Sequence, residues 1–308
     1  MNIDELNSLV DSGEIDEFIR VCEARQCKEI SKIADDAASR GCIRAVLLAG
    51  ASSAGKTTTA KRLCTQLRVD GIAALHLSTD DYFVGDKRNP RDENGELDYE
   101  TVEAVDRERL SQDIAGLLAG DAVKTRRFNF VMHDGYDSDT PTKLPEGGIV
   151  VLEGLHALNP SILPGIDDKS KYRLFIEPST QPEVFVTTRL SSSDARLMRR
   201  LVRDHQFRKM DPLETFRMWP KVLAGEKKWI DPFRGLADAT FDSSLAYELA
   251  VLKPYLSGLL MRVLYRRPDE AKAQLFANLL EAVHATDPTK VPGDSILRET
   301  IGSSQLDY

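Results

Sequence analysis

A stretch of small residues between an apolar run and a helical pattern has the composition of a phosphate-binding loop. Residues 50–57 read G-A-S-S-A-G-K-T, which fits the pattern G-x-x-x-x-G-K-[ST]. The glycines let backbone N–H groups approach phosphate oxygens, Lys56 supplies a charge to the β and γ phosphates, and Thr57 can coordinate Mg²⁺. The alternative is a strand-to-helix turn whose lysine faces solvent, but a strand, a loop and a helix are all predicted in order. The residues expected to bind ATP are Gly50, Ala51, Ser52, Ser53, Ala54, Gly55, Lys56, Thr57 and Thr58.

Acidic residues stand where two predicted strands end. Asp80 and Asp81 follow the apolar run 73–78, and Glu153 follows the run 148–152. Open α/β folds bind ligands at this edge of the sheet, so a carboxylate there can take the proton of an alcohol held in line with a γ-phosphate. We favour Asp80 over Asp81 for this role; alternatively both cap a turn. Glu153 suits a position that holds Mg²⁺ or its waters, with a helix cap or an ion pair as the alternative. The expected metal ligands are Thr57, Asp80 and Glu153.

A run of arginines at helical spacing could bind phosphoryl groups. Its members recur at i, i+3, i+4 and i+7 and so share one helix face: Arg196, Arg199, Arg200 and Arg203. Arg208 and Lys209 follow just beyond. In a chain of net negative charge this concentration favours a nearby anion, and arginine forks suit the phosphates of a nucleotide over which a lid helix closes. The alternatives are a solvated face paired with Asp194 and Asp204, and an RNA-binding face.

Alternating apolar runs and helical patterns predict the elements that position these residues. Short strands separated by helices are typical of a parallel sheet with crossover helices. The strands are predicted at 44–49, 73–78, 148–152, 172–176 and 239–241. The helices are predicted over most of 2–40 and at 56–69, 102–118, 194–206, 212–224, 245–260 and 269–283. The polar stretch 84–100 is expected to form a surface loop.

The composition narrows the class of protein. The chain has 308 residues, with 41 Lys and Arg against 49 Asp and Glu, and a net charge of −8. Nothing overall therefore favours a nucleic acid partner. The four cysteines have no zinc-ligand spacing, and the apolar runs are shorter than the ~20 residues of a membrane span. We expect a cytoplasmic protein with reduced thiols and no membrane contact. A homo-oligomer is compatible with the sequence.

Taken in order, the motifs resemble the uridine-cytidine kinase branch of the phosphoribulokinase and uridine kinase family. The similarity covers about residues 43–260 and rests on GASSAGKTT, DDYF, LDYETVEAVD, RFNFVMH, VVLEGLHAL and DARLMRRLVRD. A bacterial subgroup of nucleoside kinase-like proteins is more similar still, because it shares segments like NPRDENG, MWP, ELAVLKPY and SILRE. The expected fold is a three-layer α/β/α phosphate-loop sandwich with a mostly parallel sheet and an arginine-rich helical lid. The expected activity is transfer of the ATP γ-phosphate, with Mg²⁺, to the 5′-hydroxyl of a nucleoside such as uridine or cytidine, as in pyrimidine salvage.

The resemblance also implies roles for single residues. Asp80 matches the catalytic aspartate, which acts with Lys56. Glu100 falls where the family has an acid that binds the ribose 2′ and 3′ hydroxyls. The other positions expected to contact the nucleoside are Asp81, Tyr82, Phe128, His133 and Arg200. Arg203 and Arg208 correspond to lid arginines on the phosphates.

Two positions depart from the family pattern and leave the acceptor open. Met210 replaces an arginine that helps to read a pyrimidine, and Met218 replaces a polar nucleoside contact. A thioether cannot supply the hydrogen bonds that make base selection sharp. The alternatives are a kinase of a deoxynucleoside or a sugar phosphate, and an RNA-associated ATPase or switch, because subgroup members often carry synthetase-like N-terminal domains. We expect a helical leader at 1–40, which looks trimmed beside such domains, a kinase domain at 41–265, and a C-terminal helix and tail at 266–308.

Overall fold

Five parallel strands form the central sheet of the computed structural model, which describes residues 1–129, 132–179, 183–185 and 188–307. Their order across the sheet is β2-β5-β1-β6-β9, and every neighbouring pair is parallel. The strands are β1 (Ala45–Gly50), β2 (Ala74–Ser78), β5 (Ile149–Glu153), β6 (Lys171–Glu177) and β9 (Ala239–Asp242). All five predicted strands are confirmed, with ends shifted by one residue or not at all. Their carboxyl ends lie at one edge of the sheet.

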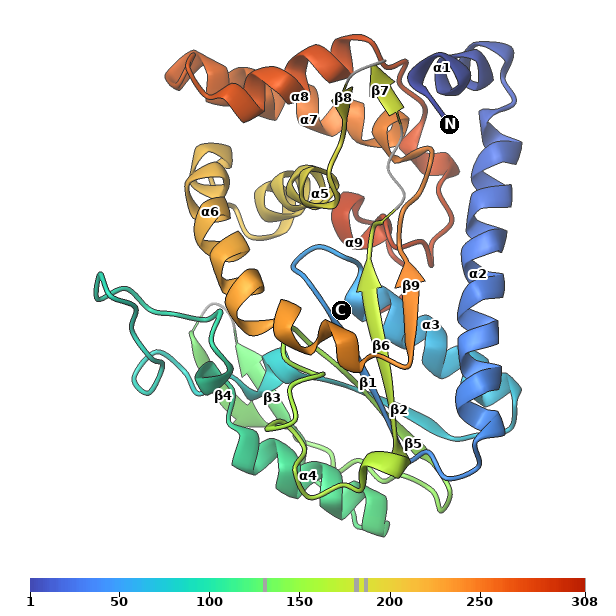
Figure 1. The fold of residues 1–308 in the computed structure, drawn as a ribbon, viewed down its shortest axis with the longest axis vertical. Coiled ribbons are helices and arrows are strands. Elements are labelled where there is room, and N and C mark those ends of the chain that lie inside the picture. The colour runs from blue at the N-terminus through green and yellow to red at the C-terminus, as the bar shows by residue number, and fades with distance from the viewer. Residues whose placement is uncertain (130–131, 180–182, 186–187, 308) are drawn as a thin grey trace.

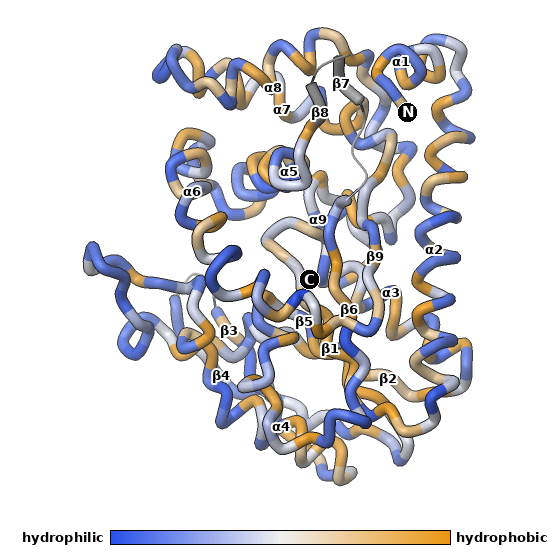
Figure 2. Tube along the Cα trace, viewed as in Figure 1, coloured by the Kyte–Doolittle hydropathy of each residue, from blue (hydrophilic) through white to orange (hydrophobic). Residues whose placement is uncertain are grey.

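Helices cover both faces of this sheet, so the expected α/β/α sandwich is confirmed (Figure 1). On one face α2 (Ile15–Ser39) and α3 (Lys56–Val69) pack on Val46 and Leu48 of β1. On the other face α4 (Arg107–Ala119) packs on side chains that include Leu47. Alternate residues of β1 thus enter two different cores, which is the period-two pattern of a strand buried on both sides. Figure 2 shows apolar residues along the strands and polar ones on the outer side of α2.

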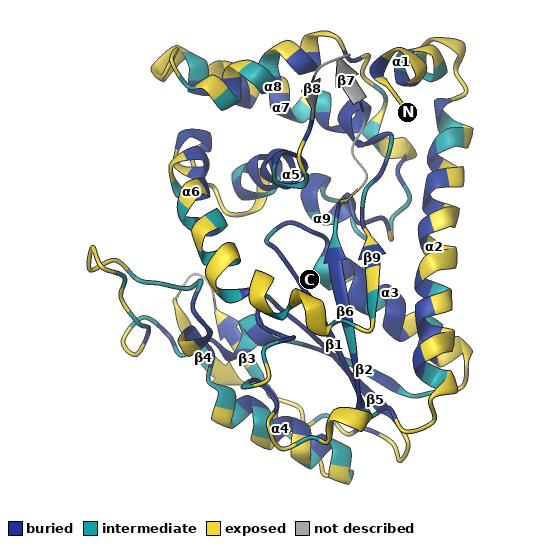
Figure 3. Ribbon diagram, viewed as in Figure 1, coloured by how far each residue is buried: buried dark blue, intermediate teal, exposed yellow. Residues whose placement is uncertain are grey.

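A second group of helices lies beyond the edge to which the strands point (Figure 1). They are α1 (Ile3–Ser12), α5 (Ser192–Phe207), α6 (Pro212–Trp229), α7 (Glu248–Arg266), α8 (Ala271–Glu281) and α9 (Arg298–Ile301). These helices share one hydrophobic core with the first half of α2, and their buried faces turn toward each other in Figure 3. Because α1 and α2 contribute Leu6 and Ile19 to this core, the N-terminal helices are packed into the molecule.

The structure differs from the sequence prediction in smaller elements. The helix expected over most of 2–40 is two helices, because Gly13 adopts φ 78° and ends α1. The helix expected at 102–118 is a 3₁₀ turn at Val102–Ala104 followed by α4, whose cap is Asp106. Two antiparallel hairpins were not predicted: β3 (Arg126–Asn129) with β4 (Asp134–Asp137), and β7 (Glu183–Phe185) with β8 (Thr188–Arg189). Among the described residues, no helix is both long and apolar enough to cross a bilayer.

Candidate active site

The phosphate loop, residues 50–57, joins the end of β1 to the start of α3. A Cβ at Gly50 would lie 2.3 Å from the carbonyl oxygen of Ile176, so β6 passes too close for any side chain there. Gly55 is the N-cap of α3 with φ 90°, and Ser53 has φ 60°. A backbone that enters the left-handed region in this way forms a concavity of N–H groups, and the helix N-terminus adds positive potential. Lys56 Nζ lies over the loop and donates to the Ala51 carbonyl at 3.2 Å.

Two carboxylates and a hydroxyl meet beside this loop. Strands β2 and β5 are neighbours, and Ser78 lies opposite Glu153. Asp80 follows Ser78 by two residues, so it lies at the same edge of the sheet as Glu153. Thr57 Oγ1 donates to Glu153 Oε1 at 3.1 Å. Burial raises the pKa of Glu153, and the negative charge of Asp80 raises it further. The structure therefore brings together the three residues expected to hold a metal.

Two histidines of the site were missed by the sequence analysis. His76 lies on β2 with Nε2 3.9 Å from Glu153 Oε1, and burial lowers its pKa to about 4, so the ring is neutral at neutral pH. His156 is buried beside the charges of Asp80 and Lys56, and burial lowers its pKa to about 4 as well. A signal was present in the sequence. His156 follows Glu153 by three residues, and His76 has the same strand parity as Ser78.

On the acceptor side, Glu100 lies within electrostatic reach of the loop. Its side chain is largely buried, which raises the pKa of Glu100 to about 7, and the surrounding charges include those of Arg200, Lys56 and Asp80. The charges of Lys56 and Asp80 also shift the pKa of Glu153. One lysine and three predicted carboxylates thus share one electrostatic environment.

The remaining predicted nucleoside contacts lie around the β3–β4 hairpin. Asp81 accepts hydrogen bonds from Arg127 Nη1 at 3.2 Å and from the Phe128 N–H at 3.4 Å. The ring of Phe128 is buried and packs edge-to-face on Phe83, with centroids 5.5 Å apart. His133 is half exposed with φ 51°, and its Nδ1 lies 3.4 Å from Asp86 Oδ1. Phe130 of the same motif lies outside the described residues.

Tyr82 is placed differently from the other predicted contacts. Its side chain has no exposed surface, and its hydroxyl donates to Asp113 Oδ2 at 2.9 Å. A ring buried in this way leaves no surface for a substrate, so the structure does not place Tyr82 in contact with one. Instead the hydrogen bond fixes the turn that carries Asp80 and Asp81 against α4.

The arginine run divides into two groups. Arg196 and Arg199 form buried ion pairs with Glu226 at 2.9 Å and with Glu248 at 2.5 Å. The other two, together with Arg208 just beyond the run, surround one acid, Asp204, which has no exposed surface: Arg200 at 3.1 Å, Arg203 at 2.7 Å and Arg208 at 3.6 Å.

These three arginines are called the arginine cluster below, and two of them lie at the phosphate loop. Arg200 Nη1 donates to Ser52 Oγ at 3.0 Å, and Arg203 lines a hollow together with Ser53 and Gly55. Three guanidinium groups around one carboxylate leave an excess of positive charge. Because that excess faces a concavity of backbone N–H groups, the arrangement is suited to a polyanion such as a triphosphate.

Comparisons with known proteins agree with this geometry. The sequence profile of the Phosphoribulokinase / Uridine kinase family matches residues 45–248. A uridine kinase of Deinococcus deserti is 27% identical over 192 residues, which are 62% of this chain and 83% of that protein. A uridine kinase of Staphylococcus aureus is 24% identical over 205 residues, or 66% of this chain and 89% of that protein.

Among solved structures, a protein named as a fructose transport system kinase from Silicibacter sp. TM1040 has a similar fold. Its TM-score is 0.50 at 18% identity, over 68% of this chain and 98% of that one. At this identity the similarity concerns the fold, whereas the family match covers both the phosphate loop and the arginine run. The chain therefore belongs to the phosphoribulokinase / uridine kinase family and is a phosphotransferase with a hydroxyl acceptor.

Proposed function

We propose that the protein transfers the γ-phosphate of ATP to the 5′-hydroxyl of a nucleoside, with uridine and cytidine as the first candidates. The observation that carries this proposal is that Glu153 accepts a hydrogen bond from Thr57 of the phosphate loop, while Lys56 and Asp80 lie within electrostatic reach of both Glu153 and Glu100. An anion-binding loop faced by carboxylates is the arrangement that phosphoryl transfer to an alcohol requires. The relatives named as uridine kinases support the choice of acceptor.

The donor would lie between the loop and the arginine cluster. The N–H groups of residues 50–58 and the charge of Lys56 bind the phosphate chain, and Lys56 exchanges its contact with the Ala51 carbonyl for phosphate oxygens. Arg203 and Arg208 neutralise charge that builds up on the transferred group. Because Asp204 already orients the arginines, little reorganisation is needed when ATP binds.

The residues present fit a magnesium ion. Thr57, Asp80 and Glu153 offer hard oxygen ligands. Burial and the repulsion by Asp80 both raise the pKa of Glu153, and a bound cation would relieve the repulsion. The described part of the chain holds no cluster of three His, Cys, Asp or Glu side chains able to bind a metal alone. Phosphate oxygens would complete the coordination, as is usual for Mg²⁺, and the ion would offset charge on the β and γ phosphates.

Asp80 and Glu100 would act on the acceptor. Asp80 accepts the proton of the attacking hydroxyl, so that the oxygen can bond to the γ-phosphorus as the bond to the β–γ bridging oxygen breaks. Glu100 accepts hydrogen bonds from the ribose hydroxyls and holds the attacking oxygen in line. The charges of Arg200 and Lys56 favour the ionised form of Glu100, against the burial that raises its pKa.

The proposal is tested by ATP consumption over a panel of nucleosides, deoxynucleosides, sugar phosphates and RNA. We expect uridine or cytidine to raise turnover in the wild-type protein, and Asp80→Asn to lower it by about a hundredfold or more, the range for loss of a positioned base. Asp139→Asn, an exposed carboxylate, is the matched control and should keep full activity. Turnover raised by RNA and by none of the small acceptors would overturn the proposal. A sugar phosphate as the best acceptor would reassign the substrate.

A further inference from the structure

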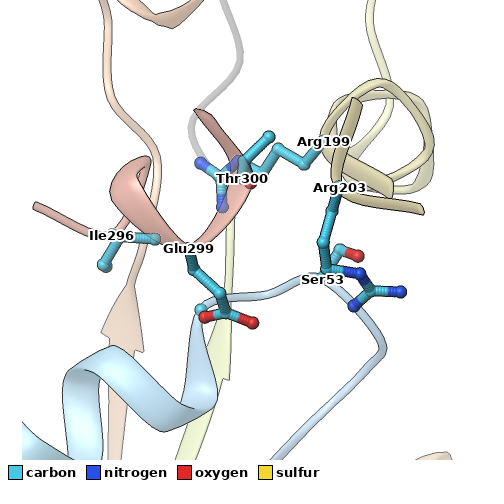
Figure 4. Close-up of a pocket in the computed structure, with 7 residues that line it drawn as sticks. Ser53, Arg199, Arg203, Ile296, Glu299 and Thr300 are labelled. Atoms are coloured by element: carbon cyan, nitrogen blue, oxygen red, sulfur yellow. The ribbon is translucent and has the colours of Figure 1, made fainter. Parts of the chain in front are cut away.

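A small hollow lies between the phosphate loop, α5 and the C-terminal segment, which we define as residues 291–302. The space left free in it is about 10 Å³, and its walls are Ser53 and Gly55, the arginines Arg199 and Arg203, and Ile296, Glu299 and Thr300 (Figure 4). A cavity of roughly 10–15 Å³ on this scale holds one water molecule. The hollow is therefore too small for the nucleoside part of a nucleotide while the C-terminal segment is in place.

The hollow contains polar atoms that lack partners. Among the described residues, Arg199 Nη1 and Ser53 Oγ are buried and make no hydrogen bond. Arg199 is 1% exposed, and its other nitrogens are engaged by Glu248 and the Ser243 carbonyl. A buried donor without a partner is costly, so the site is suited to an occupant that carries acceptors. Ribose oxygens and phosphate oxygens are such acceptors.

The C-terminal segment covers the phosphate-binding end of α3. A Cβ at Gly55 would lie 2.5 Å from Ile296 Cγ2, so the Ile296 side chain rests on the loop backbone. Thr58 Oγ1 donates to Glu299 Oε2 at 3.4 Å, and Figure 4 shows the Glu299 carboxylate directed toward the start of α3. A carboxylate at a helix N-terminus takes the position that favours a phosphate.

Contacts with the rest of the molecule hold the segment in this position. Ser295 donates to Glu23 Oε1 at 2.5 Å, and Gln206 Nε2 of α5 donates to the Thr300 carbonyl at 3.3 Å. Within the segment, Arg298 donates to the carbonyls of Pro292 and Gly302, each at 3.3 Å. Ile296 and Leu297 are buried in two different cores. These contacts place Glu299 beside Thr58, in the first turn of α3.

We propose that the C-terminal segment is part of the donor site, and that Glu299 is a residue that determines how strongly the site binds the donor nucleotide. This inference rests on the proposed function, because it needs ATP on the loop. Glu299 and the donor compete for the same helix N-terminus, and their like charges repel. The nucleoside end of ATP enters the hollow only when residues 296–300 move outward, and Arg199 Nη1 and Ser53 Oγ then gain partners.

Glu299→Gln tests the competition without changing the shape of the side chain. By calorimetry with ATP and Mg²⁺ we expect the variant to bind three- to tenfold more tightly, the range for removing one like charge from a partly hydrated site. Glu281→Gln removes an exposed charge at the end of α8 and should leave the affinity unchanged. Equal or weaker ATP binding by Glu299→Gln would overturn the inference.

Hydrogen exchange provides a second measurement that does not depend on a variant. Amides of residues 293–302 should exchange faster when ATP and Mg²⁺ are added, because the segment is displaced, while amides of the phosphate loop become protected. Slower exchange in the segment would contradict displacement. If ATP binds and changes hydrogen exchange as expected but no acceptor is phosphorylated, the proposed function alone is refuted. If the protein is an active kinase but ATP does not change hydrogen exchange in the segment, this inference alone is refuted.

Discussion

Replacing Asp204 by asparagine tests the arginine cluster, on which the proposed donor site depends. The Asp204 carboxylate is fully buried and accepts from Arg203 Nη2 at 2.7 Å and from Arg200 Nε at 3.1 Å. Asparagine has nearly the same shape but no charge, and its amide nitrogen can only donate. The variant therefore leaves the cluster without a buried counter-charge while the packing is kept.

The expected loss of stability follows from burial. Removing one partner of a buried ion pair costs about 3–5 kcal/mol. The side chains of Arg203 and Arg208 are 12% and 49% exposed, so both guanidinium groups can turn partly to water. We therefore expect a loss at the lower end of this range, about 3 kcal/mol. In a chain of this length 1 kcal/mol shifts the melting temperature by about 2 °C. We expect Asp204→Asn to melt roughly 6 °C below the wild type.

Thermal and urea unfolding, each with and without ATP and Mg²⁺, measure this effect. The matched control is Asp269→Asn, whose carboxylate is 73% exposed in its pair with Arg267 and should contribute under about 1 kcal/mol. Because the cluster in the variant lacks its anion, ATP should raise the melting temperature of Asp204→Asn more than that of the wild type.

Two results would refute this reasoning. Unfolding of Asp204→Asn at the temperature of the control would mean that the arginines are held by something other than Asp204. An equal or smaller response to ATP in the variant would mean that the donor does not bind beside the cluster, even if the stability falls as expected.

Three further predictions concern single residues of the site. Gly50→Ala should abolish ATP binding measured by calorimetry, because its Cβ would lie 2.3 Å from the Ile176 carbonyl oxygen and the loop must shift. Tyr82→Phe removes a buried hydrogen bond and should lower the free energy of unfolding in urea by about 1 kcal/mol, with the acceptor KM changed less than about twofold; a large rise in KM would restore a direct contact. The pKa of Glu100, about 7, predicts that the acceptor KM falls as pH rises through 7, because the ionised form binds the ribose, and that Glu100→Gln loses this dependence. Since the folded pKa lies above the unfolded value, the same group makes the unliganded wild type less stable as pH rises from about 4.5 to 7, and Glu100→Gln should lose this contribution while that of Glu153 remains.

The sequence was sufficient to predict the helices and strands that are defined by local patterns of residues. The prediction for α3 has the observed bounds, Lys56–Val69, because a glycine N-cap begins it and its apolar period runs unbroken. The five strands were found because each is an apolar run between turn signals. The break at Gly13 was missed because the apolar pattern continues on both sides of it, and only its left-handed backbone ends the helix.

Partners distant in sequence could not be predicted. Periodicity places Arg199 and Arg200 on one helix face, but it does not say that the first meets Glu248, 49 residues later, while the second meets Ser52. The contact of Ile296 with Gly55 has no local signal either, because it depends on how the C-terminal segment folds back. Such pairings are decided by packing and by the need to neutralise buried charge.

The separation of charge across the site would let a chain of net charge −8 hold a triphosphate in one orientation, as the proposed function requires. Asp80 and Glu153 lie on one side of the loop, and the arginine cluster lies where α5 meets the loop at Ser52. In the proposed complex, the metal-bound end of the phosphate chain is drawn to the acids and free phosphate oxygens to the arginines. The γ-phosphate is then presented where Asp80 can deprotonate an alcohol, so the charges that bind the donor also select which end of it reacts.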